Sequence, residues 1–288
     1  MKRNSLFIML LLSAFYGKSQ LLWEISGKGA KTSYIFGTNH LAPASFLDSI
    51  PKIYKAFNST QVVVGEVLMS AENISDTIMQ HAAMPQNILL KSLFSEEDYA
   101  LINDAVQKTL FLNLSDIARL KPAMITLMYE QAIYEKLFPK KESFQIDSYF
   151  QQVAELQSKP VFGLETAVQQ STLLFGNQTL ERQAQLLAAA VKDSASTIDE
   201  IRAVVKLYEK QDIYGLYSLF VSDTSATAPT AQEKSSLLDD RNALWAEKIT
   251  KIIKKQSAFI AVGALHLPAE NGLLNLLQKK GFKVKAVQ

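Results

Sequence analysis

The chain contains no cysteine in its 288 residues. This absence excludes disulfides, thiolate nucleophiles, lipid-anchor cysteines and cysteine-based zinc sites, so any metal ion would need histidine and carboxylate ligands. Histidine is itself scarce, with three in the whole chain. A chain of this size can bury a sufficient core without disulfides, so their absence leaves an oxidising compartment open.

The sequence also lacks a marked excess of charge of either sign. It has 30 basic and 28 acidic residues, which gives a formal net charge of +2. Lys2, Arg3 and Lys18 lie in the first nineteen residues, which contain no acid, so the rest of the chain has 30 minus 3, or 27, basic residues against 28 acidic ones. This balance does not provide the basic surface that binds a phosphate backbone, and we expect no nucleic-acid partner.

Long apolar runs are confined to the N-terminus. Two basic residues precede the apolar stretch 6–16 (LFIMLLLSAFY), and small residues follow it. This pattern is typical of a secretory signal peptide, which we predict at residues 1–19 with cleavage near Ser19 and Gln20. The stretch is too short to span a bilayer, and no later stretch reaches membrane length. We therefore expect an exported protein, periplasmic or secreted, without a transmembrane segment in its mature form.

Strand patterns cluster at the two ends of the chain, and helical patterns fill the middle. Strands are predicted at 21–25, 32–36, 62–64, 161–162, 258–262 and 282–287. Helices are predicted at 50–57, 149–156, 180–191, 198–220, 237–253 and 273–280, and across about 70–138, with starts at Ser95, Ser115 and Pro122. The stretch 222–236 is predicted to be a loop.

The simplest architecture for this order of elements is an α/β fold. We expect one domain over residues 20–288, with a central sheet built from the N- and C-terminal segments. A large helical insertion would occupy about 70–140 and 180–255.

Two of the three histidines follow a glycine at the same offset, each after a predicted strand. Gly37 and His40 frame GTNH, and Gly263 and His266 frame GALH; both motifs continue into a leucine and a nearby proline. With 11 glycines in 288 residues, this coincidence has a chance of roughly four in a thousand. We interpret the pair as a real repeat, in which glycine lets the backbone turn sharply at the carboxyl end of a strand. Ligands bind at that edge in open α/β sheets.

Two acids occupy comparable places, Glu66 at the end of VVVGE and Glu165 at the end of VFGLE. Burial of Glu66 without a partner would be costly, which favours a function for it, whereas Glu165 could act directly or only orient a neighbour. Imidazoles and carboxylates that meet at strand ends suit Zn, Mn, Co or Fe. Such an ion would lower the pKa of a bound water and polarise a carbonyl. Without a metal, the same groups could perform general acid–base chemistry.

Arg241 lies on a mostly apolar helix face and therefore needs an acidic partner or an anionic ligand. Glu66, Glu165 or Asp147 could pair with it in a structural salt bridge, and the sequence leaves a direct role on substrate open beside that reading. We interpret Asp147 as the cap of the helix that follows it. The third histidine, His81, has no comparable context and is interpreted as structural or superficial.

In combination, these motifs resemble the TraB/PrgY/GumN family. The resemblance spans residues 23–287 and is carried by GTNH, VVVGE, FGLET, LLDDRN and AVGALHLPAENGLLNLLQKKGFKV. The family includes the PrgY pheromone-shutdown proteins and the animal Tiki proteases, and it is distantly similar to erythromycin esterases and ChaN haem-binding proteins. This implies an EreA/ChaN-like fold. One departure is the LPAENG that follows His266, where many relatives have a glycine soon after the leucine.

The resemblance implies an exported, metal-dependent hydrolase, a Tiki-like peptidase with Mn, Co or Zn as its divalent metal. The implied metal ligands are His40, Glu66 and His266. The implied catalytic residues are these three with Glu165 and Arg241, and the implied substrate-binding residues are Asn39, Arg241 and Asn242. The substrate would be a peptide or a small ester. The alternatives are a haem- or peptide-binding protein on the same fold and a metal-independent esterase that acts through histidine and glutamate. The sequence leaves the oligomeric state open.

Overall fold

The computed structural model describes residues 20–139, 145–225 and 227–287. The predicted signal peptide, residues 1–19, lies outside the described residues. Within them, no helix combines the length and the apolar character needed to cross a membrane.

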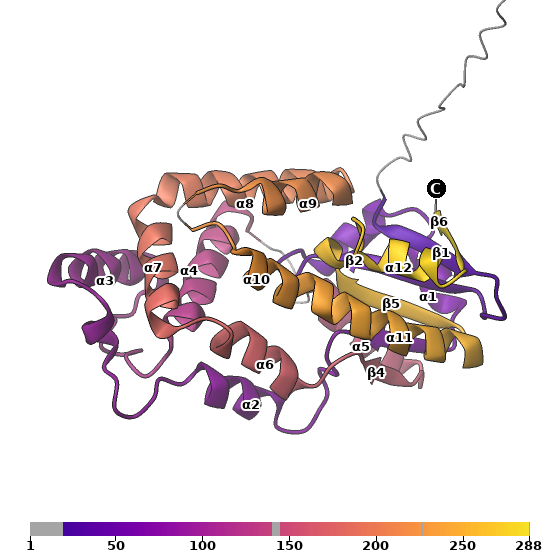
Figure 1. The fold of residues 1–288 in the computed structure, drawn as a ribbon, viewed down its shortest axis with the longest axis horizontal. Helices are drawn as coiled ribbons and strands as arrows, with labels where there is room; N and C mark the ends of the chain where they lie inside the picture. The colour runs from indigo at the N-terminus through magenta and orange to yellow at the C-terminus, as the bar shows by residue number, and fades with distance from the viewer. Residues whose placement is uncertain (1–19, 140–144, 226, 288) are drawn as a thin grey trace, which may run out of the picture.

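A six-stranded mixed sheet forms one end of the molecule, with strand order β4-β3-β5-β2-β1-β6 (Figure 1). The four strands β4, β3, β5 and β2 are parallel, and β1 and β6 add to one edge in antiparallel pairings. The strands are β1 (Leu22–Ser26), β2 (Ser33–Thr38), β3 (Val62–Gly65), β4 (Val161–Gly163), β5 (Ala258–Gly263) and β6 (Lys283–Ala286). All six predicted strands are present, and the mixed α/β class is confirmed. Five strands come from the two ends of the chain, and the edge strand β4 comes from its middle.

Helices cover both faces of this sheet (Figure 1). The helices against it are α1 (Ile53–Asn58), α5 (Ile146–Leu156), α11 (Asp240–Lys255) and α12 (Leu273–Lys279). On one face, Phe57 of α1 and Phe150 of α5 pack their rings against Phe36 and Phe259 of the central strands. The amphipathic helix α11 contributes Trp245 to the same buried core. Burial of such rings supplies much of the hydrophobic stabilisation of the sheet.

The remaining helices form a second body at the carboxyl end of the parallel strands (Figure 1). They are α2 (Ile74–Ala82), α3 (Glu96–Leu110), α4 (Pro122–Leu137), α6 (Ala167–Gly176), α7 (Leu180–Lys192), α8 (Ser194–Glu209), α9 (Ile213–Ser222) and α10 (Ala231–Lys234). Short 3₁₀ turns lie at Ala44–Ser49, Leu90–Leu93 and Ala264–His266, and a π-helical turn lies at Ser235–Asp239. The helices α3, α4 and α7 contact one another around a hydrophobic core of their own, which includes Ile102, Ile125 and Leu187.

The helices predicted at 50–57, 149–156, 180–191, 237–253 and 273–280 are present, with ends that differ by a few residues, whereas the predicted helix starts have mixed outcomes. The Ser95 hydroxyl accepts the N–H of Asp98 at the start of α3, and Pro122 is the first residue of α4. Ser115 does not start a helix but lies in a turn between these two helices. The predicted helix 198–220 is two helices, because Gln211 adopts a left-handed conformation with φ of 58° and ends the first.

Two further corrections concern the segment after β4 and the predicted loop. The helix α6 was not predicted, although Thr166 and Gln169 form a capping box at its start, a pattern that is visible in the sequence. The predicted loop 222–236 is shorter than expected, because Thr230 and Glu233 form a second capping box that starts α10.

Gly37 allows β2 to approach the 3₁₀ turn that follows β5. A Cβ atom on Gly37 would lie 2.9 Å from Leu267 Cδ1 and 3.0 Å from the Cα of Ala264. The positive-φ glycines of the described chain are Gly27, Gly29 and Gly281. The predicted sharp turn at Gly37 is therefore wrong, and close packing of the two GxxH segments is the reason for glycine there.

Substitution of Gly37 by alanine should destabilise the protein, because the backbone of the 3₁₀ turn must move to admit a methyl group. We expect a loss of about 1–3 kcal/mol in the free energy of unfolding. Gly176→Ala is the matched control, since the nearest atom to its new Cβ would be a threonine methyl at 3.9 Å. That variant should gain about 0.4–1 kcal/mol. Urea denaturation measures both, and equal effects of the two variants would contradict the close-packing argument.

Candidate active site

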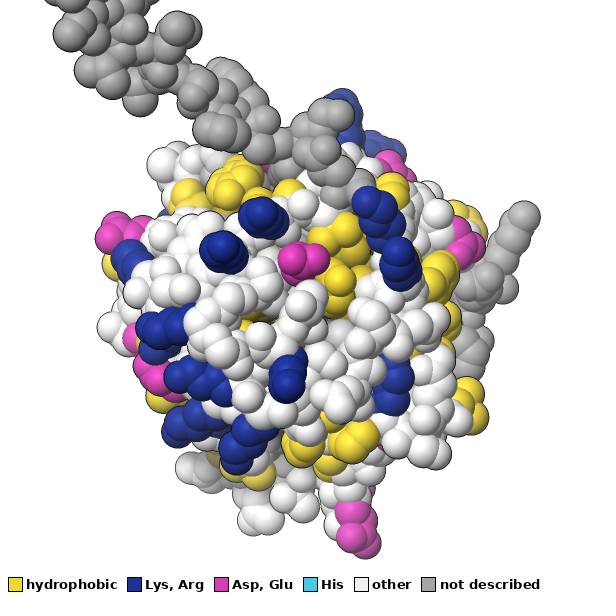
Figure 2. Space-filling model, turned by 90° about the vertical axis from the view of Figure 1, so that its right-hand side faces the viewer, with side chains coloured by type: hydrophobic (Ala, Val, Ile, Leu, Met, Phe, Trp, Pro, Cys, Tyr) yellow, Lys and Arg dark blue, Asp and Glu magenta, His cyan; other side chains and the backbone are white. Residues whose placement is uncertain are grey.

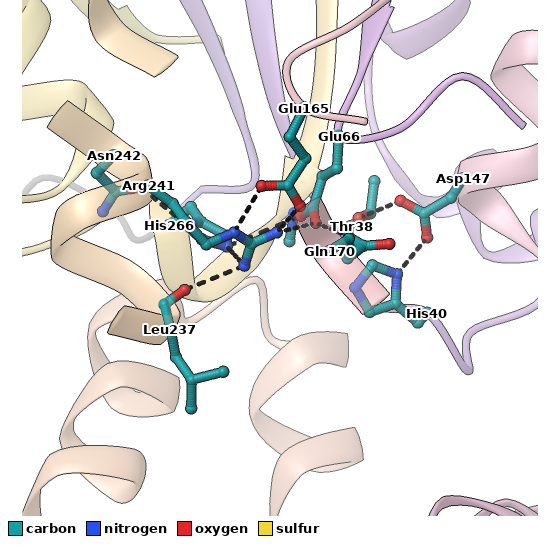
Figure 3. Close-up of polar contacts among 11 residues, drawn as sticks. Thr38, His40, Glu66, Asp147, Glu165, Gln170, Leu237, Arg241, Asn242 and His266 are labelled. Atoms are coloured by element: carbon teal, nitrogen blue, oxygen red, sulfur yellow. Dashed lines mark hydrogen bonds and ion pairs between the residues drawn. The ribbon is translucent and has the colours of Figure 1, made fainter. Parts of the chain in front are cut away.

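The predicted site residues meet at the carboxyl ends of the four parallel strands. His40 lies two residues after β2, Glu66 directly follows β3, Glu165 follows β4, and His266 lies in the 3₁₀ turn after β5. Arg241 reaches the same place from the first turn of α11 (Figure 3). Residues that are up to 226 positions apart in the sequence (266 minus 40) thus form one cluster.

The guanidinium of Arg241 forms the centre of this cluster and is 14% exposed. Its Nε and Nη2 donate to the two oxygens of Glu165 at 3.1 and 2.7 Å, and Nη2 also donates to Glu66 Oε2 at 2.8 Å. Its Nη1 donates to the carbonyl of Leu237 at 3.0 Å and to His266 Nε2 at 3.1 Å. A guanidinium has five N–H donors, and these five contacts use all of them. Arg241 can therefore donate to a substrate only after it gives up one of these partners.

His266 is buried and held as the neutral Nδ1–H tautomer. The side-chain amide of Asn242 donates to the carbonyl of Asn271 at 2.9 Å, which leaves its oxygen to accept from His266 Nδ1 at 2.7 Å. The other ring nitrogen then accepts from Arg241. The Trp245 ring lies against both groups: its centroid is 4.5 Å from that of the tilted His266 ring and 4.4 Å from the guanidinium carbon. Burial lowers the pKa of His266, and the positive charge of Arg241 lowers it further. The negative charge of Glu66 acts in the opposite direction, and the resulting pKa is about 3.

Glu66 is buried, 7% exposed, and ionised. Its Oε1 accepts the backbone N–H of Gly263 at 2.8 Å, and its Oε2 accepts from Arg241 and from the amide of Gln170 at 3.0 Å. Burial raises the pKa of Glu66, but the positive charges and the N–H donor around it outweigh burial and lower the pKa to about 2. At neutral pH those charges are Arg241 and His40, since His266 is neutral.

His40 differs from the other members of the cluster because 63% of its side chain is exposed. Its Nδ1 donates to Asp147 Oδ2 at 3.0 Å, and the other oxygen of that carboxylate accepts from Thr38 at 2.7 Å. The attraction of Asp147, opposed by burial, raises the pKa of His40 to about 9. Water screens part of this attraction at so exposed a group.

The prediction that Asp147 caps a helix is wrong. It lies inside the first turn of α5, whose N-terminal flanking residue Gln145 makes no side-chain cap. The carboxylate instead turns to the end of β2 and orients the His40 ring. Its partner is 107 residues away in the chain, and no local pattern reveals such a contact.

Gly263 marks the point on which the cluster converges. A Cβ atom placed there would lie 3.3 Å from Glu66 Oε1, 3.5 Å from His266 Cδ2 and 3.8 Å from His40 Nε2. The free nitrogen of His40 thus faces the same small space as Glu66. Any side chain at position 263 would enter that space, which explains the glycine of the second GxxH motif.

The backbone that carries His40 is clamped from the helical body. The Tyr208 hydroxyl of α8 donates to the carbonyl of Gly37 at 3.0 Å. The Asn39 side chain accepts the N–H of Leu41 at 2.9 Å within its own loop. The predicted substrate roles of Asn39 and Asn242 remain predictions, and both side chains already have partners inside the protein.

Three residues of this site were not predicted from the sequence, Thr38, Gln170 and Tyr208, and neither was the orienting role of Asp147. Thr38 lies inside the GTNH motif, so its position was visible but its role was not. The third histidine, His81, lies on α2, where its Nδ1 bonds to the carbonyl of Thr77 at 2.8 Å.

A divalent metal held by His40, Glu66 and His266 does not fit this arrangement. Both nitrogens of His266 already have hydrogen-bond partners, and the positive charge of Arg241 lies against two of the three groups that would bind the ion, Glu66 and His266. Over the described ranges, no three histidine, aspartate or glutamate side chains are grouped closely enough to hold a metal ion. Metal binding would require Arg241 to withdraw from His266 Nε2.

The two GxxH histidines should titrate at opposite ends of the pH scale. We expect an NMR titration, with signals assigned through His→Gln variants, to show His40 changing charge near pH 9 and His266 neutral down to about pH 3. In Asp147→Asn the midpoint of His40 should fall toward 6.5, because the carboxylate that stabilises the imidazolium is gone. A midpoint that does not move in this variant would show that Asp147 does not control His40.

Comparison with known proteins gives one match. The sequence profile of the TraB/PrgY/gumN family matches residues 21–286, nearly the whole chain. No curated protein and no solved structure matches the chain significantly. The EreA/ChaN-like relationship therefore stays a prediction. The profile match covers all five of the converging side chains, and the chain belongs to the TraB/PrgY/gumN family.

Proposed function

We propose that this chain is a hydrolase in which His40 exchanges protons with water and substrate, and that its substrates carry ester or amide bonds. The observation that supports this most directly is the geometry of His40. It is the exposed member of a buried polar cluster, its Nδ1 is fixed by a carboxylate, and its Nε2 faces the space beside Glu66. A base oriented by an acid in this way is the arrangement that general acid–base catalysis needs.

Water is the attacking group in this proposal. The chain has no cysteine, and the hydroxyl of Thr38 is buried and donates to Asp147. Neutral His40 takes a proton from water at Nε2 while the water oxygen bonds to the carbonyl carbon. The imidazolium, stabilised by Asp147 and Glu66, then gives that proton to the leaving oxygen or nitrogen as its bond to carbon breaks.

The buried groups hold the geometry in which this transfer occurs. Arg241 keeps Glu66 and Glu165 ionised and fixed at adjacent strand ends, and its bond to His266 ties β5 to the same network. Glu66 faces His40 across the space at Gly263 and favours the protonated form of His40. We assign Arg241, Glu165 and His266 to positioning, since none has a free donor or acceptor comparable to His40 Nε2.

The metal-dependent peptidase implied by the family resemblance is the second candidate. His40 Nε2 and Glu66 Oε1 face one space, as two ligands of an ion would. The hydrogen bonds of His266 and the position of Arg241 favour the metal-free route over this one. The two routes differ in their response to chelators and added metal.

Replacement of His40 should abolish hydrolysis. We expect His40→Gln to lower kcat/KM by at least about 100-fold on whichever aryl ester or library peptide is cleaved. His81→Gln is the matched control and should retain activity, since its imidazole bonds only within α2 among the described contacts. Thermal unfolding of both variants checks that the fold is intact.

The same assay separates the two routes. Activity that survives chelators and gains nothing from Mn, Co or Zn supports the metal-free route, and chelator-sensitive activity restored by one of these ions establishes the metal-dependent one. A folded protein that cleaves neither aryl esters nor library peptides would overturn the hydrolase proposal in favour of a binding role. A His40→Gln variant that remains active would overturn it as well.

The pH profile should report the charge of His40. Because the neutral ring accepts the proton, kcat/KM should rise about tenfold per pH unit below the pKa of His40 and level off as pH approaches 9. In Asp147→Asn the plateau should begin at lower pH and lie at a lower rate, because the ring becomes a weaker and less oriented base. A lower rate with an unchanged midpoint would instead indicate a purely structural role for Asp147.

A further inference from the structure

The end of the molecule farthest from the helical body carries a concentration of lysines, visible as dark blue side chains that outnumber magenta ones (Figure 2). We call this the basic face. Among the described residues, Glu247 is the carboxylate paired into it, through Lys280. The basic face consists of Lys28, Lys31, Lys251, Lys254, Lys255, Lys280 and Lys283.

These lysines come from three elements that are in contact. The β1–β2 hairpin lies against the turn between α12 and β6, where Lys28 Nζ donates to the carbonyl of Lys280. The same hairpin touches the last turn of α11 through a bond from the N–H of Lys31 to the carbonyl of Ile253 at 2.8 Å. Glu247 of α11 bonds to Lys280 across this junction. The seven positive charges therefore share one surface.

The position of the basic face follows from the topology. The carboxyl ends of α11 and α12 and the hairpin all lie at the amino edge of the parallel strands, opposite the edge that carries His40 (Figure 1). Cations at helix carboxyl ends stabilise the helix dipole, which explains Lys254 and Lys255. The same reason does not apply to Lys28 and Lys31 on the hairpin, to Lys251 in mid-helix or to Lys283 on a strand.

The chain as a whole does not carry this excess of positive charge. Of its 28 acidic residues, 23 lie between positions 70 and 240, in the segments that build mainly the helical body. The near-neutral net charge of the chain thus conceals an uneven distribution, in which one end of the molecule is positive. All seven cations of the basic face are lysines, and the arginines of the described chain lie elsewhere, at 119, 182, 202 and 241.

We propose that the basic face docks onto an anionic lipid surface. Clusters of four to eight basic residues bind acidic headgroups where they flank a membrane helix or lie on an amphipathic helix, and the basic face presents a similar number of lysines on one surface. Lysine is a point charge without a fixed partner geometry, which suits a mobile array of headgroups. Recognition of nucleic-acid phosphates or carboxylates on a protein favours the bidentate fork of arginine, which this surface lacks.

Docking in this way sets the orientation of the whole molecule. The amino edge of the sheet faces the headgroups, and the strand ends that carry the candidate active site face the solution. The attraction is electrostatic and therefore weakens as salt shortens the Debye length. The proposal does not depend on the proposed hydrolase activity.

Co-sedimentation with lipid vesicles tests the proposal. We expect residues 20–288 to bind vesicles of phosphatidylcholine with about one-third phosphatidylglycerol, and not phosphatidylcholine alone, at about 0.1 M salt. Binding should disappear at about 1 M salt, where the Debye length is about 3 Å. Lys254→Glu/Lys255→Glu should weaken binding at least about tenfold.

Lys206→Glu/Lys210→Glu is the matched control, because it makes the same change of charge at the exposed carboxyl end of α8. This variant should retain vesicle binding, and circular dichroism of both variants checks folding. Equal loss in the two variants, equal binding to neutral vesicles, or no binding at low salt would each overturn the proposal. So would retention of the protein by duplex DNA or heparin under conditions where it ignores acidic vesicles.

Discussion

The pairing of one guanidinium with two buried carboxylates is the constraint on which the rest of this site depends. Glu66 and Glu165 follow adjacent strands, and their charges would repel each other and resist burial without Arg241 between them. Removal of one partner from such a buried network typically costs about 3–5 kcal/mol, because it leaves an unpaired charge behind. Arg241 also donates to His266 and so joins the ends of β3, β4 and β5 through one planar group.

This network makes the two GxxH motifs unequal, although their sequences look equivalent. His266 is buried, neutral and bonded at both nitrogens, and His40 is exposed and positively charged. Matched histidines suggest equivalent roles, and the sequence pattern predicts that both act in one site, either on a metal ion or in general acid–base chemistry. Burial keeps His266 neutral, and Asn242 and Arg241 bond to its two nitrogens. His40 is charged because the carboxylate of Asp147, which also lies outside the motifs, stabilises its protonated form.

The parts of the fold that could be predicted from sequence are those that rest on local chemistry. Runs of β-branched residues marked the buried strands, and the offset of glycine and histidine marked the strand ends that form the site. The contacts of each side chain were harder to predict from the sequence, because Asp147 and Tyr208 reach His40 and its loop from helices more than 100 residues away. The reason predicted for glycine at position 37 is wrong, since only packing in three dimensions distinguishes a close approach from a sharp turn.

The central place of β5 has a consequence for the biosynthesis of this protein. This strand, residues 258–263, pairs with both β2 and β3, which the ribosome makes some 200 residues earlier. Until β5 emerges, β2 and β3 each present an unsatisfied edge, the feature that makes partly made chains prone to aggregate. Closure of the sheet and assembly of the cluster around Gly263 therefore wait for β5, so the site cannot form before this strand is made.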